Sequence, residues 1–347
     1  MKLIERRVTP ADSPFAITTA MILAVLAAML VTSLLFVLYG ANPLRAYFAL
    51  FHEPFASLRG FGYTLVRTAP LTLIALGTIV SWRSGFGYLG FEGCFLVGAA
   101  VTTWLGLFTT VSWFLPWALL LSFIGGAAWA GVVALIRARL GGNEVLISLM
   151  TNYVAILMVQ YLVSGPMRAP GGVPETAILP RSTWLPFILP GTRAHAGVLL
   201  AILATALVWM LLRKTPLGYE LIVSGLSPAA ARFGGINVGA RLVFAAFVAG
   251  GLGALAGTVE VLGEQHRLMD GVSGGVGFTG IIVALLAKLN PLAVIPAAVL
   301  YGGMTVGANA MQRRAGIPSS ITFILQSLIV LMVLASDLFR RYRVNLK

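Results

Sequence analysis

The sequence predicts an all-α protein that crosses a membrane about ten times, and its composition is the first observation behind that prediction. Hydrophobic residues make up 59% of the 347 residues, and charged residues only 10%. Soluble domains carry about 25% charged residues. A chain with so little charge lacks the polar surface that water requires, so most of its surface must face lipid.

The apolar residues also lie in stretches long enough to cross a bilayer, which takes about 20 residues per helix. We expect ten such helices, at residues 15–39, 62–81, 88–109, 113–136, 145–164, 196–212, 241–262, 275–289, 291–311 and 320–339. Together they make residues 1–347 a single transmembrane domain. An even number of spans puts both termini on the same side of the membrane.

The basic residues are the third observation, because they gather at the ends of the apolar stretches. The net charge is +13, and the main groups are Lys2/Arg6/Arg7, Arg137/Arg139, Arg213/Lys214 and Arg340/Arg341/Arg343/Lys347. Such residues are enriched in cytoplasmic loops, which places both termini in the cytoplasm. Nucleic-acid binding is not expected, because no basic groove interleaved with aromatic residues is visible.

Alternating the loops from a cytoplasmic N-terminus assigns residues 213–238 to the cytoplasm and residues 165–195 to the opposite side. The second segment is rich in Pro and Gly, which favours an ordered loop or short surface helices. Arg313 and Arg314 also fall outside the cytoplasm, where basic residues are disfavoured. Either an acidic patch on a docking protein or lipid phosphates would explain them.

Two glycine-rich segments, residues 85–90 and 275–280, interrupt the apolar sequence and match the pattern GxGxxG. A dinucleotide site needs a strand before that pattern, and neither segment has one. Paired interruptions in the two halves of a chain are typical of transporters built from related halves. We expect Gly90 and Gly277 to lie where helices begin or bend beside a solute path, with Glu92 capping or steering from one side. The alternative is close helix packing through small residues.

One predicted span carries a polar stripe, because Glu144, Ser148 and Asn152 are four residues apart and share a helix face. A polar stripe on an apolar helix must face the interior of a helix bundle. There it either contacts a polar, uncharged solute or joins helices by hydrogen bonding.

Few other ionisable residues lie inside the predicted spans. We expect Arg67 to extend its side chain toward the membrane surface and Glu260 to be solvated near a helix end. The sequence has no catalytic set, no metal-spaced cluster and no Gly-Lys pair, so it holds no Walker A site. It also lacks a relay of Asp, Glu and His residues, which weakens an ion-driven mechanism.

The segment after Arg213 contains a short helix signal. Ser227 is a good N-cap and Pro228 suits the first helical position. Residues 229–233 continue the helix, and Gly234/Gly235 ends it. Two turns of helix are unstable alone in water, so this helix must pack on the rest of the chain or on a partner.

The same segment resembles the coupling loop of ABC-transporter permeases in the branched-chain amino acid, ribose and nucleoside group. The matching residues are Thr215, Pro216, Gly218, Gly225, Ala229, Ala230, Gly235 and Ile236. Ile222 departs from the pattern, since an arginine is often found there in the family.

Three further runs strengthen the resemblance, which covers roughly residues 60–340. Residues 143–153 are similar to a run of nucleoside and simple-sugar permeases, and depart from it at Thr151. Residues 88–94 keep the glycines and the glutamate of a second run but lose its Asn and Gln. Residues 277–286 resemble a third run, in which Thr279 stands where an aspartate is usual.

The resemblance implies a type II ABC importer-like permease, built from two related halves, in the bacterial inner membrane. Its partners would be cytoplasmic ABC ATPase subunits, a second like or unlike permease chain, and an extracytoplasmic solute-binding protein or lipoprotein. ATP hydrolysis would take place on the separate subunits, so the chain is expected to be no enzyme and to need no cofactor or metal. The solute would be a nucleoside or simple sugar, with a branched-chain amino acid as the alternative. An ion-coupled secondary transporter and a membrane enzyme acting on lipid are the rivals from other classes.

The resemblance and the residue patterns together assign three groups of candidate site residues. The translocation path would include Gly90, Glu92, Ser148, Asn152, Gly277 and Thr279. Coupling to the ATPase would involve Gly225, Ser227, Pro228, Ala229, Ala230, Arg232, Phe233 and Gly235. Arg313 and Arg314 would dock the solute-binding protein.

Overall fold

The protein is described here by a computed structural model, which covers residues 4–6, 14–109 and 113–344. Apart from two antiparallel three-residue strands, β1 (Ile4–Arg6) and β2 (Tyr342–Val344), its regular elements are helices. The all-α prediction is therefore confirmed for the described residues.

A helix occupies each of the ten stretches that the sequence marked as apolar. In chain order the α-helices are α1 (Pro14–Leu38), α2 (Pro43–Ala56), α3 (Leu58–Arg83), α4 (Phe91–Phe108), α5 (Phe114–Leu140), α6 (Glu144–Ser164), α7 (Gly197–Lys214), α8 (Pro216–Leu226), α9 (Pro228–Phe233), α10 (Val238–Glu260), α11 (Val276–Leu286), α12 (Pro291–Ala315) and α13 (Ser319–Arg341). A 3-10 helix, η1 (Arg181–Thr183), and a π-helix, η2 (Val261–Gln265), complete the described helices.

Seven of the described helices are long and apolar enough to cross a membrane: α3, α4, α5, α6, α7, α10 together with η2, and α12. The chain is therefore a multi-pass membrane protein. The stretch expected to span at residues 275–289 is shorter than predicted, because α11 has only 11 residues. Lys288 and Leu289 adopt positive φ angles of 50° and 54°, and this left-handed turn separates α11 from α12.

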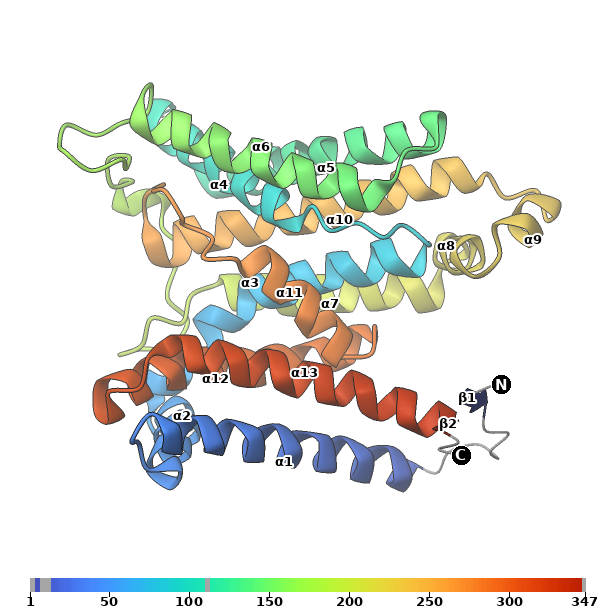
Figure 1. The fold of residues 1–347 in the computed structure, drawn as a ribbon. Coiled ribbons are helices and arrows are strands. Elements are labelled where there is room, and N and C mark those ends of the chain that lie inside the picture. The colour runs from blue at the N-terminus through green and yellow to red at the C-terminus, as the bar shows by residue number, and fades with distance from the viewer. Residues whose placement is uncertain (1–3, 7–13, 110–112, 345–347) are drawn as a thin grey trace. The chain divides into compact units, whose positions relative to one another are not determined.

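The chain contacts define two compact units, each described by itself. In the unit made of residues up to Phe61 and from Gly303, α1 and α13 run side by side (Figure 1). Phe36, Met311 and Ile317 belong to its small buried core. In the unit Gly62–Gly302, α10 packs against both α4 and α5 (Figure 1).

Small residues bring these central helices into close contact. A Cβ atom added at Gly98 would collide with the carbonyl of Ala254, and one added at Gly126 would collide with the carbonyl of Gly250. Membrane helices associate through such small residues because lipid provides no hydrophobic force between them. The packing therefore depends on backbone approach, and it holds α4 and α5 close to α10.

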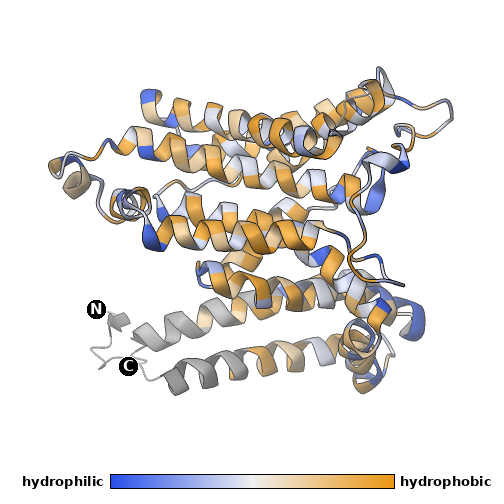
Figure 2. Ribbon diagram, turned by 180° about the vertical axis from the view of Figure 1, so that it is seen from behind, coloured by the Kyte–Doolittle hydropathy of each residue, from blue (hydrophilic) through white to orange (hydrophobic). Residues whose placement is uncertain are grey.

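The hydropathy of the helices matches a lipid environment. Figure 2 shows hydrophobic residues along the helix bodies and hydrophilic residues mainly at their ends and in the loops. Large apolar side chains such as Leu120, Leu157 and Leu203 are exposed on α5, α6 and α7. A helix that is apolar even on its exposed side is typical of a membrane span. These three helices thus present lipid-facing surfaces, whereas most of α3 and α4 is buried.

Candidate functional site

Glu92 joins the two glycine-rich segments. It lies in the first turn of α4, two residues after the N-cap Gly90, and it is only 4% exposed. Its Oε2 accepts a hydrogen bond of 2.9 Å from the backbone N–H of Gly277, and its Oε1 accepts one from the Ser273 hydroxyl. A carboxylate at a helix N-terminus is stabilised by the free N–H groups and the helix dipole. We call this arrangement, Glu92 with Ser273 and Gly277, the Glu92 cap.

The glycines at both helix starts leave no room for a side chain. A Cβ atom at Gly277 would lie 2.5 Å from the Cα of Glu92, and one at Gly90 would collide with the ring and hydroxyl of Tyr88. Gly90 begins α4, and Gly277 lies in the first turn of α11, as the sequence predicted. The local packing alone accounts for both glycines. Close helix packing, the alternative that the sequence left open, therefore stands beside the predicted solute path.

The polar stripe of α6 faces the interior, as predicted, and it binds the broken backbone before α4. The Ser148 hydroxyl accepts a hydrogen bond of 3.1 Å from the N–H of Leu89. The Asn152 side chain accepts one of 2.8 Å from the N–H of Gly93 and donates one of 3.0 Å to the carbonyl of Leu89. Both side chains are buried. Their contacts therefore favour the helix-joining role among the alternatives that the sequence left open.

The other two polar candidates lie at the margins of this arrangement. Glu144 forms an ion pair with Arg137 at 3.1 Å, so its negative charge is balanced at the beginning of α6. The Thr279 hydroxyl donates to the Gly275 carbonyl of its own helix at 3.0 Å. In the part of the chain that the structure describes, no group of three or more His, Cys, Asp or Glu side chains could hold a metal ion.

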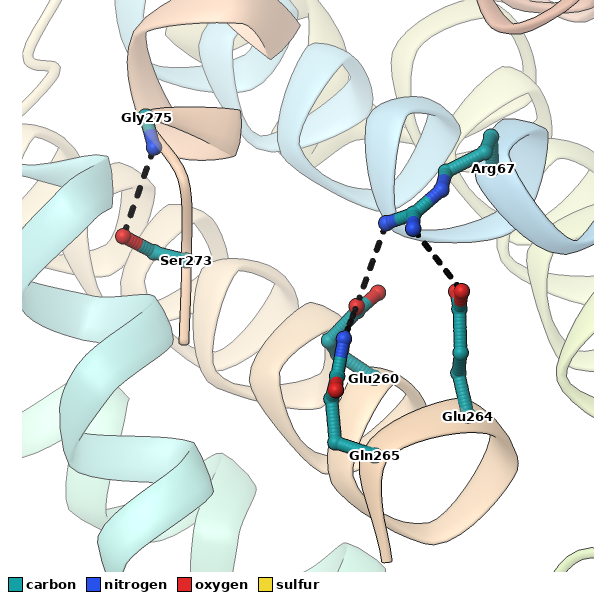
Figure 3. A network of polar contacts seen from close by, with 6 residues as sticks. All are labelled: Arg67, Glu260, Glu264, Gln265, Ser273 and Gly275. Atoms are coloured by element: carbon teal, nitrogen blue, oxygen red, sulfur yellow. Dashed lines mark hydrogen bonds and ion pairs between the residues drawn. The ribbon is translucent and has the colours of Figure 1, made fainter. Parts of the chain in front are cut away.

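A charged cluster on α3, α10 and η2 was not predicted. Arg67 contacts the carboxylates of Glu260 at 3.3 Å and Glu264 at 2.8 Å, and Gln265 donates to Glu260 at 3.1 Å (Figure 3). We call Arg67, Glu260, Glu264 and Gln265 the charged cluster. Figure 3 also draws Ser273 and Gly275, on the segment that leads into α11, as a separate hydrogen bond.

The charged cluster corrects two expectations. Glu260 is only 2% exposed rather than solvated, and Arg67 points to carboxylates rather than to the membrane surface. The π-helix carries Glu264 and Gln265 into the cluster, and π-helical turns are frequent at functional sites. A signal was present in the sequence: one arginine inside an apolar span and two glutamates four residues apart at the end of another, where such residues usually pair.

The loop 165–195 is ordered, as predicted, and it contains the short helix η1. It is bound to the chain around and beyond η2. The N–H of Leu185 donates to Leu262, that of Leu179 to His266 and that of Thr176 to Leu268, at 2.8 to 3.0 Å. The loop therefore lies against the same end of α10 that carries the charged cluster.

Two histidines lie where this loop meets η2. His195 is buried, and its Nδ1 accepts a hydrogen bond of 3.2 Å from the N–H of Gly197. Burial, together with the nearby His266, lowers the pKa of His195 to about 4. The imidazole is therefore neutral at physiological pH.

The short helix predicted at residues 227–233 is confirmed as α9. The Ser227 hydroxyl accepts from the N–H of Ala230 at 3.3 Å, and Gly235 follows with a positive φ of 79°. Ala231 packs inward, whereas Phe233 is 98% exposed. The preceding helix α8 was missed, although Thr215 and Pro216 carry the same cap signal and Thr215 accepts from the N–H of Gly218.

Arg313 and Arg314 end α12, and both are exposed. Arg314 pairs with Glu53 of α2 at 2.7 Å and remains 58% exposed. The same face is hollowed by a cavity of about 750 Å³, whose lining includes Arg45, Phe48 and Arg314. Part of the charge expected to face a partner is thus balanced within the chain.

Comparison with known proteins identifies the class. A family model described as the permease component of the branched-chain amino acid transport system matches residues 60–334. The chain belongs to this family, and it is the membrane permease subunit of an ABC transporter. Permease subunits of this class carry out transport and are not themselves enzymes.

Several relatives extend along nearly the whole chain. The glucose ABC transporter permease protein TsgB13 of Haloferax volcanii is 32% identical, over 100% of this chain and 94% of the relative. The guanosine ABC transporter permease protein NupP of Bacillus subtilis is 30% identical, over 92% and 93%. The nucleoside ABC transporter permease protein NupB of Lactococcus lactis is 27% identical, over 90% and 89%.

Proposed function

We propose that this permease imports a nucleoside or a simple sugar across the bacterial inner membrane. The observation that carries the proposal is the Glu92 cap, because it joins two helix starts from distant parts of the chain. Irregular backbone at membrane depth is tolerated where it is buried in protein or lines a cavity, and interrupted helices in both halves mark the binding site of many transporters. Relatives named for glucose, guanosine and nucleosides support this class of solute.

The proposed path uses side chains and backbone that suit a polar, uncharged solute. It comprises Gly90, Glu92, Ser148, Asn152, Gly277 and Thr279. The hydroxyl and amide groups of Ser148, Asn152 and Thr279 are of the kind that hydrogen-bond the hydroxyls of a sugar, and in this structure they bind the chain itself. The only carboxylate among them, Glu92, already accepts hydrogen bonds from the chain. A charged solute would find no free counter-charge in this set.

The proposed contact with the ATPase is α9 and its flanks: Gly225, Ser227, Pro228, Ala229, Ala230, Arg232, Phe233 and Gly235. Small residues on α9 permit close approach, and the exposed ring of Phe233 offers an anchor for a pocket. The helix has six residues, too few for stability without a surface to pack on. Two cytoplasmic ABC ATPase subunits would supply that surface and hydrolyse the ATP.

The remaining assignments follow from the same family. The whole chain, 1–347, would form one permease domain with about ten spans in two related halves, of the type II importer class. Residues 213–238 and both termini would be cytoplasmic, and residues 165–195 extracytoplasmic. Arg313, with Arg314 sharing its charge with Glu53, would dock an extracytoplasmic solute-binding protein or lipoprotein. The permease would act as a dimer with a like or unlike chain.

Transport in proteoliposomes tests the proposal. The permease is reconstituted with its ATPase, its second permease chain and its binding protein, and uptake of labelled guanosine, glucose and leucine is compared. We expect uptake of guanosine or glucose that requires both ATP and the ATPase. Uptake of leucine alone would favour a branched-chain amino acid permease. Uptake driven by a proton or sodium gradient without the ATPase would favour a secondary transporter.

A further inference from the structure

Residues 83–85, at the end of α3, connect three parts of the permease. The helix ends at Arg83, and Gly85 follows with a positive φ of 79°. The N–H of Phe86 closes the helix end by donating to the Ser81 carbonyl at 3.0 Å. This is the hydrogen-bond pattern of a glycine-terminated helix end, so the chain direction changes sharply here.

The first connection is to α8, the helix before α9. A Cβ atom at Gly225 would collide with the Arg83 carbonyl and lie 2.7 Å from the Gly85 nitrogen. Conversely, one at Gly85 would lie 3.0 Å from the Cα of Gly225. The two backbones are in direct contact with no side chain between them. A displacement of α8 must therefore displace the end of α3, because there is no free space to absorb it.

The second connection is made by the Arg83 side chain, which reaches the turn between α11 and α12. Its Nε and Nη2 both donate to the carbonyl of Leu289, at 3.0 and 2.9 Å. Two donors on one carbonyl fix both the distance and the direction of the contact. The end of α3 is thereby attached to an element 206 residues away in the sequence.

The turn that Arg83 holds is strained. Lys288 and Leu289 have φ angles of 50° and 54°, in the left-handed region that side chains other than glycine rarely adopt. Such residues persist where the surrounding contacts determine the backbone. The N–H of Leu289 donates to Ala284 at 3.0 Å and that of Asn290 to Ala287 at 3.0 Å. The turn is therefore stiff, and it moves with the end of α11.

The third connection is α11 itself, which is held at both ends. The Glu92 cap binds its N-terminus, and the Arg83 contact binds the turn at its C-terminus. This helix carries Gly277 and Thr279 of the proposed path. A chain of contacts thus runs from α8 through Gly225, Arg83 and Leu289 to α11.

We propose that Arg83 is a positioning residue for transport, which passes movement of the loop 213–238 to α11. The inference rests on the proposed function, since it requires that ATP-driven movement reaches this loop. Arg83 contacts neither ATPase nor solute in this account. It sets the position of the turn at residues 287–290, and through that turn it sets the position of the helix beside the path.

The test measures solute molecules transported per ATP hydrolysed, in proteoliposomes that hold the complete transporter. Arg83→Gln removes the charged fork, and we expect ATP hydrolysis to continue while the ratio falls about tenfold, within the range of coupling between distant sites. Arg83→Lys keeps a cationic donor but loses the fork, and it should recover part of the ratio. Arg139→Gln, an exposed arginine in the last turn of α5, is the matched control and should behave as the wild type.

Leu289→Gly separates positioning from a purely structural role. Glycine adopts a positive φ without strain, which offsets part of the loss of the Leu289 side chain that packs against the core, so the unfolding temperature of this variant is measured beside the ratio. It keeps the carbonyl that Arg83 binds but makes the turn compliant, and we expect a lower ratio of transport to hydrolysis. This variant also decides the case if Arg83→Gln fails to assemble.

The outcomes distinguish the two levels of inference. A wild-type transporter that couples uptake to ATP, with an unchanged ratio in Leu289→Gly and in any assembled Arg83→Gln, overturns the role of Arg83 alone. A wild-type transporter that hydrolyses ATP without uptake contradicts the proposed function, and the role of Arg83 with it. Lower ratios in both variants, with Arg139→Gln unchanged, support the assignment.

Discussion

Two buried carboxylates on neighbouring helices, Glu92 on α4 and Glu260 on α10, are compensated in different ways. Glu92 accepts hydrogen bonds from a backbone N–H and a hydroxyl at the start of α11. Glu260 binds the guanidinium of Arg67. In the first case a helix end supplies only partial charge, and in the second a full charge is supplied. The difference predicts how much folding stability the protein loses when the partner of each carboxylate is removed.

The charged cluster should show the largest effect. Arg67→Met removes the only cation bound to Glu260 and Glu264 among the described ion pairs. Breaking a buried pair leaves an uncompensated charge, which costs about 3–5 kcal/mol. We expect a large fall in the thermal unfolding temperature in detergent, with poor recovery of folded protein. Arg67→Lys keeps a charge and should lose less. An unchanged unfolding temperature in Arg67→Met would show that the cluster is not a buried pair.

His195 represents a third way to bury an ionisable group, which is to keep it neutral. Its folded pKa of about 4 lies below its ordinary value of 6.5. The unfolded chain therefore binds more protons between these values, and stability falls as the pH drops from about 6.5 to about 4. At 1.36 kcal/mol per pKa unit the full loss is about 3 kcal/mol. The measurement is unfolding temperature against pH, and His195→Gln should flatten the curve. If the unfolding temperature of the wild type and of His195→Gln fell equally with pH, the buried, neutral state of His195 would be contradicted.

The Glu92 cap brings the backbone of Gly277 into close contact with that of Glu92, and Gly277→Ala tests this contact. The added methyl group would press against the backbone of Glu92, and overpacking of this kind costs about 1–3 kcal/mol. We expect reduced stability and slower uptake with membrane insertion retained. Gly131→Ala in α5 is the control, because a Cβ atom there meets nothing within 4 Å. If both variants behave alike, the close contact at Gly277 has no energetic weight.

The same two regions show what the sequence could predict. The glycine-rich segments and Glu92 were marked because their signals are local: a break in an apolar run, and a carboxylate beside it. A capping role for Glu92 was among the expectations, but its partner, the N–H of Gly277, was not predictable, since the two residues are 185 positions apart. The capped helix α9 was predicted for the same local reason, and the missed helix α8 carried an equivalent signal in Thr215 and Pro216.

The charged cluster shows where local reasoning fails. The sequence places Arg67 and Glu260 near helix ends, and that position alone predicts side chains that reach the membrane surface or water. Their pairing joins residues 193 positions apart, and the burial of Glu260 comes from packing that no local pattern records. The predicted length of α11 was wrong for a related reason. The apolar run continues to Leu289, but two left-handed residues end the helix, and neither is a glycine that would have marked the turn.

The smallest effect on stability should come from Glu92→Gln, and it separates the two roles of this residue. The amide oxygen of Gln can still accept from the N–H of Gly277, but its NH2 group cannot accept from the Ser273 hydroxyl, so the charge is lost and the Ser273 hydroxyl must turn to accept instead. The interaction of a charge with a helix end contributes about 0.3–1 kcal/mol, or up to about 2 kcal/mol when buried. Glu92→Ala removes the hydrogen bonds as well and should cost more, because a buried donor is left unsatisfied. If Glu92 serves only as a cap, uptake should follow stability, so that Gln is nearly normal and Ala is impaired. If Glu92 also contacts the solute, Gln should lose uptake while the unfolding temperature barely changes. Equal destabilisation by Gln and Ala would contradict the cap, because it would mean that the charge alone, rather than the hydrogen bonds to α11, holds the two segments together.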